Sequence, residues 1–345
     1  MPLRFGINGV GRIGRALLRL AQGREELVPA AVNDLAPARV LARLLARDTV
    51  HGRFPGSVRE APGLASGLSI EGRQIPVFSS PEPAGIPWEE TGAQVVIEAT
   101  GRFLRRGEAA GHLRGSVRTV ILSANPDPLD PGDADLCFGL NDETFDPGRH
   151  RVVSHASCTT SCLALVTQVL HEGFTLRRAL MNSVHSYTES QRLLDSAHDD
   201  PRRARAAAAN IIPIATTTPE ALGRIIPGLA SRVNGLAVRV PTPAVAMLDL
   251  VAEVERPASV ESVRDAYRAA AAGRLGRYLG VTEEELVSSD FVGDPRSAVV
   301  DLPLVQQVGG HLVRVVAWYD NEWGYSNRLL DLLLKMAATD IYKEG

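Results

Sequence analysis

The chain has 345 residues, of which 45% are hydrophobic and 22% are charged, and its formal net charge is −3 at pH 7. These values are near those of soluble globular proteins, so they exclude a disordered chain, a collagen and a small disulfide scaffold. The length predicts two domains. Because the net charge is slightly negative, we expect no general attraction to nucleic acid or to anionic membranes.

Only three cysteines occur, and their number and spacing give neither a disulfide framework nor a zinc site. No apolar run reaches the roughly 18 residues that a membrane helix needs, and the first residues lack the pattern of a secretory signal. We therefore expect a cytoplasmic protein with no membrane span and no bound metal.

The first half of the chain predicts strands that alternate with helices. Apolar residues alternate from Leu3 to Asn8 and then recur at helical spacing over Arg12–Gln22. The stretch from Pro55 to Pro87 is rich in Pro, Gly and Ser and predicts short antiparallel strands and turns. Strands alternating with helices imply parallel βαβ units. Further strands are expected at Leu27–Val32, Val95–Ala99 and Arg118–Ser123, with a helix at Gly107–Leu113.

The pattern changes after about residue 150. A helix is expected to begin near Ser157 and to continue to Leu170, and a final amphipathic helix fits Tyr325–Ala337. The strands between them alternate in a way typical of an antiparallel sheet with one covered face. These strands are expected at Arg177–Tyr187, Val233–Val240, Met247–Val254 and His311–Tyr319.

A glycine motif, Gly9-x-Gly11-x-x-Gly14, follows the first predicted strand and opens the first predicted helix. In this context it is typical of a dinucleotide site, where the free N–H groups of Arg12 and Ile13 face a pyrophosphate. Asp34 follows the second predicted strand and can accept hydrogen bonds from ribose hydroxyls. Its carboxylate would repel a 2′-phosphate, so NAD is favoured over NADP.

A cysteine lies at the predicted start of the second-half helix. In the first turn, Cys158 would feel the helix dipole and unpaired N–H groups, which favour the thiolate. It is therefore a better nucleophile candidate than Cys162 or Cys137, although free cysteines are more often buried hydrophobic residues. The candidate base is His185, at the end of a predicted strand. Spacing alone does not choose it among the eight histidines.

Several blocks in order resemble phosphorylating glyceraldehyde-3-phosphate dehydrogenases. They are Ile7–Arg15 (INGVGRIGR), Ala156–Thr160 (ASCTT), His185–Thr188 (HSYT), Arg239–Pro243 (RVPTP) and Trp318–Ser326 (WYDNEWGYS). The resemblance implies an α/β protein with a Rossmann NAD-binding domain and an α+β catalytic domain whose sheet is mostly antiparallel. The first domain would comprise residues 1–157 with the C-terminal helix 323–345, and the second would comprise 158–322. It also implies a homotetramer.

The resemblance implies a role for each matching residue. Cys158 would attack the aldehyde of glyceraldehyde 3-phosphate, His185 would act as acid and base, and inorganic phosphate would release the acyl group, as in glycolysis and gluconeogenesis. The cofactor residues would be Gly9, Gly11, Arg12, Ile13, Gly14, Asp34, Thr100, Gly101, Ser123 and Asn321. The two anion subsites would draw on Ser157, Thr159, Thr188, Arg203, Thr216, Thr217 and Arg239.

The sequence departs from the family pattern around the anion subsites. His155 and Ser161 replace two asparagines, Asn125 replaces an alanine, Thr216–Pro219 replaces Thr-Gly-Ala-Ala, and Glu189-Ser190 follows Thr188. Loss of a glycine can reshape a loop, and an added carboxylate can weaken anion binding. Ser196-Ala197 lacks the proline typical of NAD-only members, which leaves weak NADP use open.

Two other functions remain open from the sequence. Erythrose-4-phosphate dehydrogenases share the fold and the cysteine, but His185–Thr188 and Gln191–Asp195 favour the glyceraldehyde substrate. A paralogue that binds NAD only to regulate or to scaffold would not need both Cys158 and His185.

Overall fold

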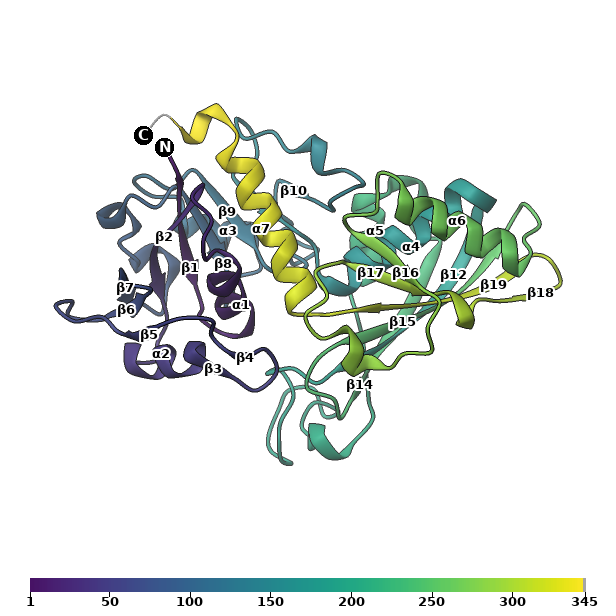
Figure 1. Ribbon diagram of the computed structural model, residues 1–345, viewed down its shortest axis with the longest axis horizontal. Coiled ribbons are helices and arrows are strands. Elements are labelled where there is room, and N and C mark those ends of the chain that lie inside the picture. The colour runs from purple at the N-terminus through teal and green to yellow at the C-terminus, as the bar shows by residue number, and fades with distance from the viewer. Residues whose placement is uncertain (344–345) are drawn as a thin grey trace. The chain divides into compact units, whose positions relative to one another are not determined.

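A computed structural model describes residues 1–343, and the chain forms two compact units (Figure 1). The first unit contains residues 1–136, 143–156 and those from Ser326 on. The second contains residues 137–142 and 157–325. Within residues 1–343, no helix combines the length and the apolar character that crossing a membrane requires.

The first unit is built on one sheet whose strand order is β10-β11-β9-β8-β1-β2-β7-β6-β5. The strands β10, β11, β9, β8, β1, β2 and β7 pair in parallel, whereas β7, β6 and β5 pair antiparallel, as the sequence predicts for the Pro/Gly/Ser-rich stretch. The strands are β1 (Leu3–Asn8), β2 (Leu27–Asn33), β5 (Val58–Glu60), β6 (Gly67–Ile70), β7 (Arg73–Phe78), β8 (Val95–Glu98), β9 (Thr119–Leu122), β10 (Ala134–Asp135) and β11 (Val152–Ser154). A small separate pair is β3 (Arg47–Asp48) with β4 (Gly52–Arg53).

The helices that begin in the first unit are α1 (Arg12–Leu20), α2 (Ala38–Ala46) and α3 (Arg106–Ala109), and α7 (Trp323–Ala337) supplies it from Ser326 on. Two 3-10 helices, η2 (Trp88–Thr91) and η3 (Ala110–His112), place polar rings in the core. Trp88 is fully buried and packs in the cluster that contains Val96 and Val120. The helix α2 was not predicted from the sequence, although Ala38, Leu41, Ala42 and Leu45 form a buried stripe at helical spacing, because the helix is only nine residues long.

The second unit contains a sheet of order β13-β14-β12-β15-β19-β17-β16, and β18 also pairs with β19. Five of its seven strand pairs are antiparallel, which confirms the expected mostly antiparallel sheet; β12–β14 and β16–β17 are parallel. The strands are β12 (Leu176–Ser186), β13 (Ile212–Ile214), β14 (Val233–Val240), β15 (Ala246–Val254), β16 (Leu279–Thr282), β17 (Ala298–Asp301), β18 (Gln306–Val308) and β19 (Leu312–Tyr319).

The helices α4 (Cys158–Phe174), α5 (Thr218–Ile225) and α6 (Val260–Ala272) complete the second unit. The long helix α4 packs against β12, β15 and β19, so its first turn meets the ends of those strands (Figure 1). Along β12, Met181, Ser183 and His185 are buried, whereas the preceding Leu180 is exposed and the intervening Asn182 and Val184 are half-buried. The period of two therefore gives His185 to the covered face of the sheet.

Candidate active site

The carboxyl ends of the central parallel strands gather the predicted cofactor residues of the first unit. The chain runs from β1 to β2 on one side and later continues with β8 and β9 on the other, so the strand order reverses between β1 and β8. Ligands of open α/β sheets bind at such a switch point. Gly9, Asp34 and Ser123 directly follow β1, β2 and β9, and Thr100 and Gly101 lie two and three residues after the end of β8.

The three glycines of the motif meet different steric limits. Gly9 has a φ of +94°, and a Cβ there would lie 2.9 Å from the backbone of Ala99 and Thr100. A Cβ on Gly14 would lie 2.3 Å from the carbonyl oxygen of Gly9. A Cβ on Gly11 would meet no atom within 4 Å. The open space at Gly11, directly before α1, is where the backbone can approach a pyrophosphate, so the loop fits NAD.

The loop also orients the ribose-binding candidate. Asp34 accepts hydrogen bonds from the backbone N–H of Val10 at 2.8 Å and from that of Ala36 at 2.9 Å. Each carboxylate oxygen therefore keeps lone pairs for a diol. The side chain of Arg12 instead pairs with Asp48, so only its backbone N–H is left for the role that the sequence predicts. Ile13 lies in the first turn of α1 and is half-buried.

In the second unit, the structure brings Cys158 and His185 together. Cys158 is the first residue of α4, and the preceding Ser157 caps the helix by accepting a hydrogen bond from the N–H of Thr160 at 3.2 Å. The Sγ of Cys158 lies 3.7 Å from Nε2 of His185, at the end of β12. Cys158 is partly exposed, whereas Cys162 and Cys137 are buried. This contrast favours Cys158 as the nucleophile.

Burial controls the charge of this pair. It raises the pKa of the Cys158 thiol, although the positive charge of Arg239 and hydrogen bonds involving Thr159 oppose that rise. The direction is opposite to the one expected from the helix start alone, because desolvation of a thiolate outweighs the dipole. Burial and the nearby Arg239 lower the pKa of His185 to about 3. The resting site therefore holds a neutral thiol beside a neutral imidazole.

The other ring nitrogen of His185 touches two groups with opposite demands. Nδ1 lies 2.8 Å from the carbonyl oxygen of Ser186 and 2.5 Å from Nη1 of Arg239. A carbonyl requires a proton on Nδ1, whereas a guanidinium, which only donates, requires a lone pair there. Only the tautomer that donates to Ser186 leaves Nε2 free to accept the proton of Cys158. Arg239 can satisfy the same carbonyl itself, at 3.0 Å.

Asn321 lies just after β19 and faces the turn between β14 and β15. Its Oδ1 accepts hydrogen bonds from the N–H of Val245 at 2.8 Å and from the hydroxyl of Ser186 at 3.2 Å. Val245 has a φ of +70°, an uncommon conformation for a β-branched residue, so Asn321 stabilises a strained turn. Within residues 1–343 the Nδ2 of Asn321 makes no hydrogen bond, which leaves an amide donor and fits a carboxamide ligand.

The predicted anion residues fall into separate groups. Thr188 bonds to Ser190 at 2.9 Å, and Arg203 donates to the same Ser190 hydroxyl at 2.7 Å. Arg203 also helps to lower the pKa of Arg239, after the larger effect of burial. Two cations that repel each other favour an anion between them. Thr216 bonds to Thr218 at 2.9 Å, and no hydrogen bond within residues 1–343 joins it to the other predicted anion residues.

The altered loops are less disruptive than the sequence suggests. Thr217 has a φ of −93° before α5, so this position does not require glycine. Glu189 is exposed and forms no hydrogen bond or ion pair with any residue in 1–343. Ser161 is buried behind Cys158, and its hydroxyl has no partner among those residues. The departures at Thr217 and Glu189 therefore leave the backbone of the site unstrained.

The hydrogen bonds that hold the first turn of α4, next to Cys158, were not predicted from the sequence. The buried Thr159 shares a 2.8 Å hydrogen bond with the hydroxyl of Tyr319, which is also 2.8 Å from the hydroxyl of Ser183. These bonds connect the first turn of α4 with β12 and β19. The position of Tyr319 inside the Trp318–Ser326 block was the available signal, but only the fold shows that its hydroxyl reaches Thr159.

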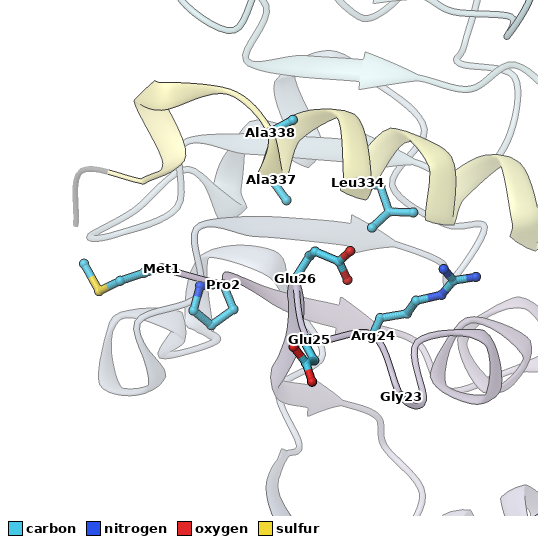
Figure 2. Close-up of a pocket in the computed structure, with 9 residues that line it drawn as sticks. All are labelled: Met1, Pro2, Gly23, Arg24, Glu25, Glu26, Leu334, Ala337 and Ala338. Carbon is cyan, nitrogen blue, oxygen red and sulfur yellow. The ribbon is translucent and has the colours of Figure 1, made fainter.

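One hollow in the first unit contains none of the predicted site residues. It has a volume of about 790 Å³ and lies between the N-terminus, the turn after α1 and the end of α7 (Figure 2). Its lining residues are Met1, Pro2, Gly23, Arg24, Glu25, Glu26, Leu334, Ala337 and Ala338. This hollow is therefore separate from the glycine loop.

Comparison with known proteins gives one consistent family. Residues 3–106 match the NAD binding domain of glyceraldehyde 3-phosphate dehydrogenase, and residues 157–321 match its C-terminal domain. The chain is 44% identical over 335 residues to glyceraldehyde-3-phosphate dehydrogenase 1 of Bacillus cereus, covering 97% of this chain and 98% of the relative. It is 44% identical over 338 residues to glyceraldehyde-3-phosphate dehydrogenase of Geobacillus stearothermophilus, covering 98% and 99%. The chain therefore belongs to the glyceraldehyde-3-phosphate dehydrogenase family, and residues 3–106 lie in its NAD-binding domain.

Proposed function

We propose that this protein oxidises glyceraldehyde 3-phosphate to 1,3-bisphosphoglycerate, with NAD as hydride acceptor and inorganic phosphate as second substrate. The observation that carries the proposal is the 3.7 Å contact between the Cys158 sulfur and Nε2 of His185 at the start of α4. A nucleophile beside a base is what covalent aldehyde oxidation requires. The relatives in Bacillus cereus and Geobacillus stearothermophilus carry the name of this activity.

The proposed reaction has three steps: addition of the thiol, transfer of a hydride and attack by phosphate. Sγ of Cys158 forms a bond to the aldehyde carbon, and the thiol proton passes through His185 to the new hydroxyl group. His185 then takes the hydroxyl proton while a hydride leaves the same carbon for NAD, which gives a thioester. Phosphate adds to the thioester carbon, the C–S bond breaks, and an acyl phosphate departs. His185 acts as base and as acid at Nε2.

Anion binding at Arg239 would prepare His185 for this role. The guanidinium contacts Nδ1 of His185, and its Nε is buried without a hydrogen-bond partner among residues 1–343. A phosphate group would satisfy that nitrogen and draw Arg239 away from the ring. Nδ1 would then donate only to Ser186, which leaves Nε2 as the proton acceptor. The proposed anion residues are Ser157, Thr159, Thr188, Arg203, Thr216, Thr217 and Arg239.

On the cofactor side, we propose that Gly9–Gly14, Asp34, Thr100, Gly101, Ser123 and Asn321 hold NAD. The Asp34 carboxylate favours NAD over NADP. We also propose a division between a cofactor domain and a catalytic domain near residues 157 and 158, and a cytoplasmic location.

The function is tested by supplying the purified protein with NAD, phosphate and each aldehyde phosphate in turn. Absorbance of reduced cofactor should show phosphate-dependent turnover with glyceraldehyde 3-phosphate. Replacing Cys158 with serine should remove turnover, by about a thousandfold or more, because a serine hydroxyl is a far weaker nucleophile. NAD affinity of the variant should stay within about twofold of the unaltered value.

The two alternatives give different outcomes in the same assay. A higher kcat/KM for erythrose 4-phosphate would assign the second substrate. NAD binding without turnover of either aldehyde would indicate a regulatory or scaffolding protein. Full turnover by Cys158→Ser would show that another group is the nucleophile.

The base is tested separately by alkylation. His185→Asn should slow the reaction of Cys158 with iodoacetamide at neutral pH, since burial raises the pKa of this thiol and leaves it protonated without a base. The rate should recover as pH rises through the thiol pKa. Mass spectrometry identifies the alkylated cysteine. Equal rates for variant and parent at pH 7 would remove His185 from thiol activation.

The glycine loop is tested with a matched pair of substitutions. Gly11→Val should weaken NAD binding by about a hundredfold, because the added side chain fills the open space left for the pyrophosphate. The control is Gly228→Val in the second unit, where a Cβ also meets nothing within 4 Å. Calorimetric titration measures both affinities. If Gly11→Val bound NAD normally, the cofactor would have to lie elsewhere.

We propose that the protein assembles as a homotetramer. On the face of the second sheet that is opposite α4, Leu180 is 68% exposed, and Leu236 and Val251 are also exposed. Leu180 is in register with Val251 on β15, and Asn182, two residues along β12, is in register with Leu236 on β14. Exposed apolar side chains on adjacent strands are typical of a protein interface.

Replacing Leu180 with aspartate should reduce the assembly, because a carboxylate would be desolvated in an apolar contact. Sedimentation equilibrium should then show dimers or monomers in place of tetramers. The control is Leu129→Asp, at an 87% exposed position of the first unit. A tetramer that survives Leu180→Asp would place the interface on another surface.

A further inference from the structure

A buried carboxylate in the first unit has no part in the proposed chemistry. Glu98, the last residue of β8, is fully buried, and no arginine or lysine within residues 1–343 pairs with it. A buried charge without a cation is stable only when enough donors surround it. The donors to Glu98 come from two arms of a hydrogen-bond network and from Thr100.

One arm of the network begins at an indole. Nε1 of Trp88 donates to Nδ1 of His112 at 3.1 Å, and Nε2 of His112 lies 3.0 Å from Oε2 of Glu98. An indole nitrogen can only donate, so Nδ1 of His112 must carry a lone pair. The proton of His112 is therefore on Nε2 and points to Glu98. A doubly protonated ring would set one N–H against another, so His112 is neutral.

The second arm begins at a backbone amide. The N–H of Ser80 donates to Oδ1 of Asn33 at 2.8 Å, which orients the amide nitrogen of Asn33 toward Oδ1 of Asn8, also at 2.8 Å. The Nδ2 of Asn8 then donates to Oε2 of Glu98 at 2.6 Å. Since Ser80 supplies a backbone donor, no amide in this arm can be reversed without a donor facing a donor.

Thr100 donates two hydrogen bonds to the other carboxylate oxygen, Oε1. Its backbone N–H lies 2.8 Å from Oε1 of Glu98, and its hydroxyl donates to the same oxygen while accepting from the N–H of Arg102. Four donors therefore converge on one buried carboxylate.

Three residues of this network lie at the ends of three neighbouring strands. Asn8 ends β1 and precedes the glycine loop, Asn33 ends β2 and precedes Asp34, and Thr100 follows β8. The order β8-β1-β2 places them along the edge where the proposed NAD site lies. The backbone of the loop is tied to the same residues, because the N–H of Gly9 donates to the carbonyl of Asn33 at 2.8 Å.

We infer that Glu98 is a positioning residue for the cofactor: through its hydrogen bonds, its buried carboxylate fixes the ends of β1, β2 and β8 in the geometry that binds a dinucleotide. The inference rests on the proposed NAD site. It concerns binding and not chemistry, because Glu98 is sealed from solvent and cannot touch a ligand. Its influence must pass through Asn8 and Thr100.

Glu98→Gln tests this inference, because the new amide must direct its NH₂ group at one set of donors. Either Thr100 or the pair of Asn8 and His112 then faces a second donor. We expect the Kd for NAD to rise about tenfold or more and the KM for NAD to rise with it. The kcat at saturating NAD, the KM for the aldehyde and the alkylation rate of Cys158 should stay within about twofold.

Trp88→Phe is the matched control, since it removes a donor of the same network from the arm that leads away from the strand ends. It should lower the melting temperature but leave the Kd for NAD within about twofold. If both variants weakened NAD binding in proportion to their loss of stability, Glu98 would be merely structural. Unchanged NAD binding in a folded Glu98→Gln protein would overturn the inference.

A measurement on the unaltered protein covers the case in which Glu98→Gln does not fold. Nitrogen-15 NMR of the histidine rings should show His112 as a single neutral tautomer with its proton on Nε2 at pH 7. A ring protonated on Nδ1 would overturn the inference. If the unaltered protein bound no NAD at all, the proposed function would fail, which is distinct from normal binding by Glu98→Gln.

Discussion

The proposed chemistry of this protein depends on the contact between a partly exposed thiol and a buried imidazole, both in a neutral state. The sulfur of Cys158 lies 3.7 Å from Nε2 of His185, burial raises the pKa of the thiol, and the pKa of the ring is lowered to about 3. A helix start alone would favour a thiolate, but desolvation acts more strongly here. In the proposed mechanism, formation of the thiolate at neutral pH would therefore need a base.

The fold provides this contact through two elements that end at the same place. α4 begins at Cys158 and β12 ends at Ser186, and Tyr319 of β19 bonds to Thr159 on the helix and to Ser183 on the strand. The thiol and the ring are thus held in place by a third element, β19, rather than by each other. Such support holds reacting groups in place when the pair changes its protonation state.

Much of this arrangement could be predicted from the sequence, because its signals are local. The glycine loop, Asp34 and the start of α4 are read from a few consecutive residues whose chemistry is specific. The missed features are non-local or weakly patterned. Ala38–Ala46 forms a helix of only nine residues, and one partner of Glu98 is Asn8, ninety positions away. The direction of the Cys158 pKa was also missed, because burial is a property of the folded chain.

The two units differ in how completely hydrogen bonds satisfy a buried ionisable side chain, Glu98 in the first and Arg239 in the second. The first surrounds the Glu98 carboxylate with neutral donors, so its charge is satisfied without any ligand. The second surrounds Arg239 incompletely, since its Nε is buried without a partner among residues 1–343 and Arg203 repels it. A satisfied buried charge gives a rigid frame, whereas an unsatisfied one raises the free energy of the empty site. Binding an anion at Arg239 would offset that cost, so part of the proposed affinity for phosphate would come from removing an unfavourable arrangement in the empty protein.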